Sequence, residues 1–347
     1  MKILAIETSC DETAIALVEA KGGVNPSTGS GPKFKILENL VASQIKIHRP
    51  FGGVVPNLAK REHLKNLPIL FKKLVASGYT LNPDIVAVTV GPGLEPALWT
   101  GINFAKEIYK EIKKLGNKEI KLIGISHLDG HLYSNILENV RIKNLFPAIA
   151  LIVSGGHTIL IKMDSLVKYK KIGETRDDAV GEAFDKVARL LNLPYPGGPE
   201  IEKLAKKGNS SAINFPRPML NQKNYDFSFS GLKTSILYYL RDNKNVKIED
   251  VAASFQSAAF EVLIKKTLRA ANEFKAKSIF ISGGVAANKT LKKEFILKIE
   301  NLKLKIDFLV PPKNLCADNA AMIAVAGYIN HLRKKKRRLT ANGNLNI

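Results

Sequence analysis

Two histidines four residues apart, with one acidic residue far along the chain, are the side chains best suited to hold a metal ion. His127 and His131 stand in SHLDGHLY, directly after an apolar run. On a helix this spacing puts both imidazoles on one face, as chelation requires. Asp318, in CADNAAMIA, offers a carboxylate at the start of a predicted helix. Two imidazoles and a carboxylate suit iron(II) or zinc, and the spacing does not distinguish the two ions.

The histidine pair has two other interpretations. An H-x-x-x-H spacing also arises from packed surface histidines that bind nothing. Metalloproteases of the H-E-x-x-H type carry glutamate directly after the first histidine, whereas this chain has Leu128 there. The sequence therefore gives little support to peptide hydrolysis.

Two similar motifs indicate a site for a phosphate group. AIALIVSGG (148–156) and SIFISGG (278–284) each join a short buried-strand pattern to Ser-Gly-Gly. Glycine adopts backbone angles closed to other residues, and the amides it exposes at a strand end cradle phosphate. Residues 285–300 have helical spacing, and we expect the positive N-terminal end of that helix to face the same anion. Two matched motifs suggest a duplicated nucleotide-binding architecture.

Further polar residues are candidates for ligand contacts. Asp185 lies in an acidic predicted helix and would bind sugar hydroxyls or an amine, although carboxylates also stabilise a helix start through its dipole. Asn288 would bond a ribose or base edge, or else cap the helix that follows it. Glu12 shares the first hairpin turn with Glu7 and Asp11, and this crowding of carboxylates indicates a cation or polar substrate nearby.

The elements that must position these side chains follow one order twice. In the first half the predicted strands are 2–8, 13–20, 36–44, 84–90 and 121–126, and the predicted helices are 56–78 and 91–116. In the second half the strands are 147–153, 157–163, 167–172, 278–282 and 305–310, and the helices are 179–192, 200–207, 231–242, 249–274, 285–300 and 317–334. This order predicts two similar α/β halves with a cleft between them, over which the loops at the strand ends meet.

Composition narrows the class of protein. The 53 Lys and Arg against 31 Asp and Glu give a net charge of +22, which favours nucleic acid as a partner; a lysine-rich genome is the alternative. No apolar run approaches the roughly 20 residues that span a bilayer, so we expect no membrane association. The N-terminus runs straight into a strand pattern, so we expect no signal or transit peptide. Two cysteines alone, Cys10 and Cys316, favour the cytoplasm.

Several motifs, in collinear order over residues 1–330, resemble the TsaD family in its bacterial form. They are ETSCDET (7–13), FGGVVPNLAKREH (51–63), GPGL (91–94), HLDGH (127–131), VSGGHT (153–158), GEAFDK (181–186), YPGGP (195–199), DFSFSGLKT (226–234), SGGVAAN (282–288) and CADNAAMIA (316–324). The resemblance implies an actin/Hsp70-like (ASKHA) duplicated α/β fold. Its first half would be 1–126 with the helix 316–334 packing back on it, and its second half 127–315 would carry the metal histidines and the adenylate-binding loops. Residues 335–347, with most of the run RKKKRR, would form a flexible basic tail.

The resemblance also implies an activity. Members of the family are tRNA N6-adenosine threonylcarbamoyltransferases: they pass the threonylcarbamoyl group of threonylcarbamoyl-adenylate to the adenine 3′ of the anticodon, in tRNAs that read codons beginning with adenine, and release AMP. A TsaB-like paralogue and a TsaE-like ATPase would be the partners beside tRNA. Two rival readings are a TsaB-type scaffold without chemistry and a sugar kinase, which the fold alone would allow. Phosphoryl transfer uses magnesium on oxygen ligands, however, rather than a histidine pair.

Residue by residue, the resemblance makes His127, His131 and Asp318 the ligands of one iron(II) ion per subunit, with zinc as a substitute in vitro. The substrate-binding positions fall on Ile152, Val153, Ser154, Gly155, Gly156, Asp185, Gly198, Glu202 and Asn288. Glu12 is the candidate general base. The chain departs from the family pattern in having Asp129 where Glu is common, Glu202 where Asp is frequent, and a longer loop at 21–33.

Overall fold

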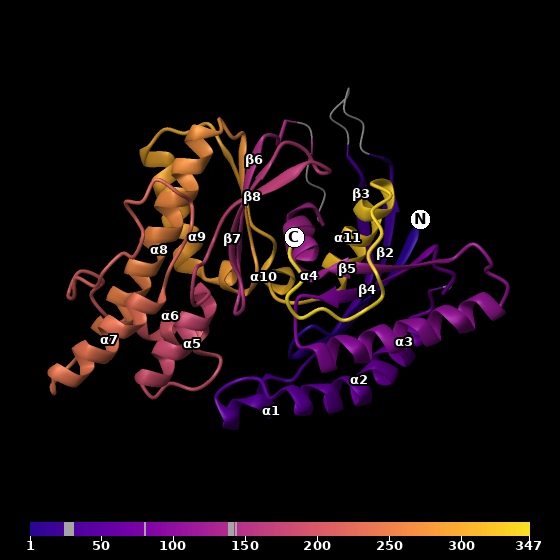
Figure 1. The fold of residues 1–347 in the computed structure, drawn as a ribbon, viewed down its shortest axis with the longest axis horizontal. Helices are drawn as coiled ribbons and strands as arrows, with labels where there is room; N and C mark the ends of the chain where they lie inside the picture. The colour runs from indigo at the N-terminus through magenta and orange to yellow at the C-terminus, as the bar shows by residue number, and fades with distance from the viewer. Residues whose placement is uncertain (24–30, 80, 138–141, 143) are drawn as a thin grey trace. The chain divides into compact units, whose positions relative to one another are not determined.

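The computed structural model describes all residues except 24–30, 80, 138–141 and 143, and it contains two compact units. Unit 1 comprises Met1–Asn144 and Lys313–Ile347, and unit 2 comprises Leu145–Pro312. Each unit is built on one five-stranded sheet (Figure 1). Most of the long loop at 21–33 lies outside the described residues.

The sheet of unit 1 has the strand order β3-β2-β1-β4-β5. Its strands are β1 (Lys2–Glu7), β2 (Glu12–Lys21), β3 (Lys33–Ser43), β4 (Ile85–Gly91) and β5 (Lys121–Ser126). Its helices are α1 (Ile45–His48), α2 (Pro56–Ala76), α3 (Glu95–Lys114), α4 (His127–Tyr133), α10 (Lys313–Cys316) and α11 (Ala320–Leu332). β1 is antiparallel to β2, which confirms the predicted hairpin, and parallel to β4.

Both faces of this sheet are covered, which explains the uninterrupted apolar run of β1. Leu4 and Ile6 lie in a core cluster with residues of α2 and α3, such as Leu67 and Ile102. On the other face α11 packs against β1 and β2, and a Cβ atom at Gly327 would lie 3.0 Å from that of Ala87. A strand buried on both faces is expected to be rich in Ile, Val and Leu rather than alternating.

Unit 2 repeats the plan, with the strand order β10-β9-β6-β7-β8. Its strands are β6 (Ala148–Val153), β7 (Thr158–Met163), β8 (Tyr169–Glu174), β9 (Ser278–Ser282) and β10 (Asp307–Leu309). Its helices are α5 (Val180–Leu190), α6 (Gly197–Ala205), α7 (Ser230–Asp242), α8 (Ile248–Glu273) and α9 (Lys289–Asn301). β6 is antiparallel to β7 and parallel to β9, as β1 is to β2 and β4, so the predicted duplication of an α/β half is confirmed.

The structure divides the chain at other points than the sequence prediction does. His127 and His131 were expected in the second half, but α4 belongs to unit 1. The reason is that α4 continues directly from β5, the edge strand of the first sheet, and packs against α11. The metal-binding candidates therefore all lie in one unit.

The C-terminal segment 335–347 is not the flexible tail that its basic composition predicted. Leu339, Ala341 and Leu345 pack against the core cluster of unit 1. The amide of Asn342 donates a hydrogen bond to the carbonyl oxygen of Val90 at 2.9 Å. The apolar residues at every second position, which the prediction passed over, attach this segment to the unit. In the described part of the chain, no helix is both long and apolar enough to cross a membrane.

Candidate metal centre and nucleotide site

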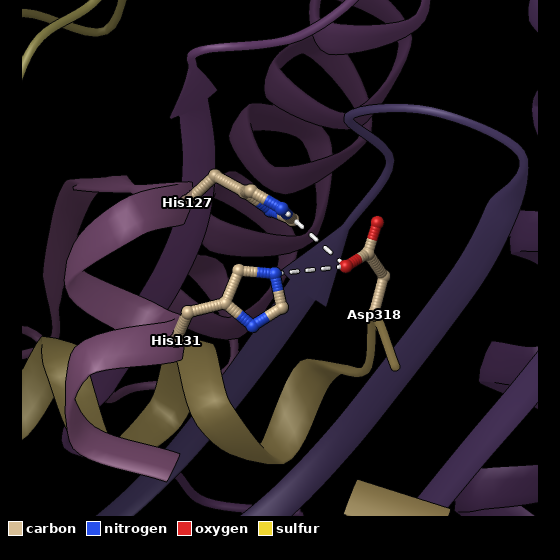
Figure 2. Close-up of side chains that lie close together, drawn as sticks. All are labelled: His127, His131 and Asp318. Carbon is tan, nitrogen blue, oxygen red and sulfur yellow. Dashed lines mark ion pairs between the residues drawn. The ribbon is translucent and has the colours of Figure 1, made fainter. Parts of the chain in front are cut away.

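Three side chains of unit 1 converge on one point (Figure 2). His127 and His131 project from the same face of α4, and Asp318 reaches them from the turn before α11. The Oδ1 atom of Asp318 lies 3.4 Å from Nε2 of His127 and 3.1 Å from Nε2 of His131. The ligand atoms of the three residues all lie within 4.8 Å of one another. This spread is close to the distance of about 4 Å that separates the outermost ligands of a single ion.

His131 is the residue that fits a metal best. Its side chain is fully buried, and within the described residues neither ring nitrogen makes a hydrogen bond of acceptable geometry, even though Nε2 is near Asp318. A buried polar atom without a partner is costly. Burial lowers the pKa of His131, so the ring is neutral at pH 7 and keeps a lone pair for a cation.

His127 is held from behind by a second carboxylate. Its Nδ1 atom lies 3.1 Å from Oε2 of Glu7 and 3.1 Å from Oγ of Ser9, both at the end of β1. Glu7 is fully buried and also accepts a hydrogen bond from the hydroxyl of Thr89 at 2.6 Å. A carboxylate on the far nitrogen of a metal-binding histidine fixes the ring and its tautomer and raises its basicity. Nε2 is thereby left to face Asp318.

The charges in this cluster favour a cation. Burial opposes ionisation of Asp318, but the charge of His127 and the close approach of both imidazoles outweigh it and hold the pKa of the carboxyl well below its usual value. Burial also opposes a charge on His127, yet Asp318 and Glu7 raise the pKa of this imidazole well above its usual value. Two carboxylates that retain a proton on a buried ring would attract a metal ion to the same place.

The turn that follows β1 contributes two further carboxyl groups. Glu12 begins β2, and the hydroxyl of Ser43 donates a hydrogen bond of 3.4 Å to it. Burial, followed by the charges of Asp11 and Asp318, raises the pKa of Glu12 well above its usual value. Burial and the same carboxylates also raise the pKa of Cys10, so this residue is a thiol rather than a thiolate nucleophile.

In unit 2 the two Ser-Gly-Gly turns lie together at the ends of β6 and β9. Ser154 and His157 close the first turn by a hydrogen bond of 2.9 Å, and Gly155 and Gly156 are exposed at its tip. Gly283 has φ of +93°, and a Cβ atom there would lie 2.3 Å from the carbonyl oxygen of Val153. Only glycine tolerates this conformation and this close approach.

The other predicted substrate positions are joined to these turns by a chain of contacts. The amide of Gly181, in α5, donates to the carbonyl oxygen of Ser154 at 3.2 Å. Asp185, one turn further along α5, accepts a hydrogen bond of 2.7 Å from the amide of Gly197, at the start of α6. Glu202, in α6, accepts one of 3.0 Å from the amide of Lys289, at the start of α9. Gly198 lies beside Gly197, so all the substrate positions that were predicted belong to one neighbourhood of unit 2.

The start of α9 differs from the prediction. Asn288 caps the helix: its Oδ1 accepts hydrogen bonds from the amides of Thr290 at 2.9 Å and Leu291 at 3.1 Å, and its Nδ2 donates to Gln256 at 3.1 Å. With Glu202 bonded to the first amide of the helix, protein side chains satisfy the amides that were expected to face a phosphate. The exposed backbone of the Ser-Gly-Gly turns is therefore the better candidate for anion contact.

Comparison with known proteins supports the family resemblance that the sequence motifs indicated. The family model described as "TsaD: tRNA N6-adenosine threonylcarbamoyltransferase" matches residues 35–325. The chain belongs to the TsaD family. The tRNA N6-adenosine threonylcarbamoyltransferase of Thermosipho africanus is 48% identical over 334 residues, covering 94% of each chain. That of Thermosipho melanesiensis is 47% identical over 349 residues and covers 100% of both chains.

Solved structures with low sequence identity to this chain share its fold. HypF of T. kodakarensis is 14% identical and has a TM-score of 0.62, with coverage of 97% of this chain and 49% of HypF. A second HypF structure, in a phosphate- and nucleotide-bound form, is 13% identical and has a TM-score of 0.59. At such identities the likeness concerns the fold alone, and it confirms the predicted actin/Hsp70-like (ASKHA) class.

Sequence reasoning predicted the three candidate metal ligands but gave no role to the residues that support them. Glu7 was noted only as one of three crowded carboxylates, and Ser9 was not singled out. The signal that could have identified both is their place at or just after the end of a buried strand, where a polar or ionisable side chain needs a partner. Asp129, between the two histidines, was noted as a departure from the family pattern and was given no role. It lies two residues from each of them and therefore on the other side of α4.

Proposed function

We propose that the chain transfers the threonylcarbamoyl group from threonylcarbamoyl-adenylate to the N6-amino group of the adenine 3′ of the anticodon, in tRNAs that read codons beginning with adenine, and releases AMP. As a member of the TsaD family, the chain is a transferase that modifies tRNA. The observation that carries the proposed reaction is the triad of His127, His131 and Asp318. Within it the buried imidazole of His131 makes no hydrogen bond to any described residue. A TsaB-type scaffold without chemistry would have no use for such a site.

We assign His127, His131 and Asp318 as the ligands of one iron(II) ion per subunit, for which zinc would substitute in vitro. The mixed imidazole and carboxylate set, with positions left open, suits either ion. When bound, the ion would act as a Lewis acid on the carbonyl group of the donor. Glu7 and Ser9 would keep His127 oriented with Nε2 toward the ion, through their contacts of 3.1 Å to Nδ1.

Unit 2 would bind the adenylate. The proposed contacts are Ile152, Val153, Ser154, Gly155, Gly156, Asp185, Gly198, Glu202 and Asn288. In support, a Cβ atom built at Gly155, Gly156 or Gly198 has no described atom within 4 Å, so the backbone there is open to a ligand. Asn288 is occupied as a helix cap, and its contribution would be limited to a second amide hydrogen of Nδ2.

The chain's own side chains would supply positioning and one proton acceptor. The N6-amino group of adenine is a poor nucleophile, so orientation of donor and acceptor should carry most of the rate. Glu12 is the candidate base: its raised pKa brings the carboxyl closer to neutral pH, where a general base works best. No other role is assigned to the crowded turn after β1.

The partners follow from the family and the charge. The tRNA is the substrate, and the net charge of +22 suits a polyanion. A TsaB-like paralogue would form a heterodimer with the chain and a TsaE-like ATPase would join them, with the reaction taking place in the cytoplasm.

One experiment tests these assignments together. The purified chain is analysed for bound metal, and then assayed for transfer with threonylcarbamoyl-adenylate, an anticodon stem-loop and both partners. We expect about one iron or zinc per chain and formation of threonylcarbamoyladenosine with stoichiometric AMP. Transfer that persists after complete removal of metal would contradict the metal assignment. Adenylate consumption without modified adenosine would contradict the reaction.

A further inference from the structure

The carboxylate between the two histidines is held by the C-terminal end of the chain. Asp129 is fully buried in α4, on the side away from the metal ligands. Its Oδ2 atom lies 3.3 Å from Nδ2 of Asn330, 3.5 Å from Nζ of Lys335 and 3.3 Å from Nη2 of Arg337. A buried charge requires such partners, and two of these three come from the segment after α11.

That segment, residues 333–345, is called the C-terminal strap here. Its odd-numbered residues are half-buried and its even-numbered residues are exposed, the period of an extended chain lying on a surface. Lys335 and Arg337 therefore point inward, with side chains 28% and 15% exposed. Their neighbours Lys336 and Arg338 point outward. The basic run thus contains two inward cations beside a buried carboxylate and two outward cations that face solvent.

The strap also touches the other support of the site. The amide of Gly93 donates a hydrogen bond of 3.3 Å to the carbonyl oxygen of Gly343. The next amide, of Leu94, donates to the carbonyl oxygen of Ser9 at 2.8 Å, and the hydroxyl of Ser9 lies 3.1 Å from Nδ1 of His127. The strap is therefore connected to α4 through Asp129 and to the turn beside His127 through Gly343.

The helix α4 needs external supports of this kind. It has seven residues with Gly130 at its centre, too short to hold its own orientation. It lies close against α11 at Gly130, because a Cβ atom there would lie 2.8 Å from Cδ1 of Ile323. The orientation of both imidazoles thus depends on what fixes α4 to α11 and to the strap.

We propose that Lys335 and Arg337 are positioning residues of the metal centre, which fix the orientation of α4 by binding Asp129. Both ends of α11 would then contribute to the metal centre. Asp318 lies just before its start, and the strap follows its last turn. The inference rests on the metal centre proposed above.

The experiment compares two pairs of substitutions in the full chain, with Co²⁺ as the probe. The inward pair is Lys335→Ala with Arg337→Ala, and the matched outward pair is Lys336→Ala with Arg338→Ala. Both remove two positive charges from one stretch of chain. The affinity for Co²⁺ and its visible absorption bands, which report ligand geometry, are measured without any assay of transfer. We expect the inward pair to weaken Co²⁺ binding about 10-fold and to change the bands, and the outward pair to stay within about twofold of the parent.

Because loss of both cations beside the buried carboxylate of Asp129 can unfold the inward pair, two further variants complete the test. Lys335→Arg with Arg337→Lys retains both charges and should retain Co²⁺ affinity within about threefold. Asp129→Asn removes the buried charge and should weaken Co²⁺ binding in a protein that still melts cooperatively.

Three other outcomes would contradict either the positioning role or the metal centre. Equal losses for the inward and outward pairs would show a general effect of charge, and unchanged Co²⁺ binding in folded Asp129→Asn would show that α4 needs no clamp; either overturns the positioning role. Failure of the parent chain to bind Co²⁺ would instead overturn the metal centre itself.

Discussion

Unit 1 and unit 2 use one strand order for two kinds of site. In each, the first strand is antiparallel to the second and parallel to the fourth: β1 with β2 and β4, and β6 with β7 and β9. Part of each candidate site stands at an equivalent point: the turn after β1 supports the metal triad, and the turn after β6 is a candidate for anion contact. The same backbone geometry therefore delivers atoms to the same edge of each sheet.

What the two turns deliver is different. After β1 the turn carries buried side chains, Ser9 at 2% exposure and Asp11 at 7%, next to the fully buried Glu7. After β6 the turn carries Gly155 and Gly156, which are exposed and have open space where a side chain would be. The site in unit 1 thus depends on the chemistry of its side chains, whereas the site in unit 2 depends on their absence. Substitutions that change charge should damage the first, and substitutions that add volume should damage the second.

The largest effect should come from removing a metal ligand. His131→Ala is expected to reduce bound metal to less than about a tenth of the parent and to abolish transfer, because two imidazoles and one carboxylate leave no spare protein ligand. Binding of an adenylate analogue to unit 2 should be unchanged. Metal content by elemental analysis and analogue affinity by calorimetry measure the two sites separately.

The control is His331→Ala, which removes a histidine from the last turn of α11, outside the triad. It should retain both metal and activity. If His131→Ala retained full metal, the assignment of the triad would be wrong. If it lost the analogue as well as the metal, the separation of chemistry between the two units would fail.

The second effect is on the nucleotide. Gly155→Val should weaken an adenylate analogue by roughly 100-fold, or about 2.7 kcal/mol, because its side chain would fill the open space at the Ser-Gly-Gly turn. Metal content should not change. Gly53→Val is the matched control in unit 1, since Gly53 is equally open. Unchanged analogue affinity in a folded Gly155→Val variant would remove this turn from the site.

Gly283→Val should also block the nucleotide, but by a different route. The φ of +93° and the carbonyl oxygen of Val153 leave no room for a side chain, so the backbone itself must move. We expect this variant to lower the melting temperature of the protein, which Gly155→Val should not do. Equal melting temperatures for the two variants would show that Gly283 is not held in the strained conformation.

A smaller effect should come from the carboxylate behind His127. Glu7→Gln keeps the shape of the side chain and removes its charge, so metal affinity should fall about 10-fold or somewhat more, the range typical of such supports. Transfer at saturating metal should recover in large part. Glu111→Gln, on the exposed side of α3, is the control. A Glu7→Gln variant with parent affinity would make Glu7 a structural residue only.

The sequence predicted the parts of the fold that local pattern determines. Strands β1 and β6 are buried on both faces, and their runs of Ile, Leu and Val are legible without the structure. The triad could be predicted because His127 and His131 are neighbours on a helix and because the motif around Asp318 is long and specific. In each case the deciding residues lie within a few positions of one another.

The contacts that could not be predicted join distant parts of the chain. Glu7 is 120 residues from His127, and Lys335 is 206 residues from Asp129. A basic run gives no sign of whether its cations face water or a buried carboxylate, so the strap was taken for a tail. For Asn288, capping and ligand binding use the same amide group, and only the positions of Thr290 and Leu291 decide which role it has.

The smallest effect concerns tRNA and the outward cations of the strap. If the charge of +22 serves tRNA, binding should weaken steeply with salt, because each neutralised phosphate releases counterions; six contacts give a log–log slope of roughly −4 to −5. Lys336→Ala with Arg338→Ala should reduce that slope by about 1 to 2 and should leave metal content unchanged. These cations are exposed, so their loss should cost affinity without affecting the fold.

A competition experiment with two RNAs tests whether the positive charge contributes to recognition of the anticodon loop or only to general binding of RNA. The target adenine must leave its stack to be modified, so an anticodon stem-loop should compete better than a duplex of equal length. The assay is run with and without the partner proteins, which would supply part of the RNA surface. Salt-insensitive binding, or equal competition by stem-loop and duplex with all partners present, would make the basic excess a property of the genome rather than of tRNA recognition. A slope that changes as much for Lys335→Ala with Arg337→Ala would mean that both faces of the strap meet RNA, and the distinction between its inward and outward cations would be lost.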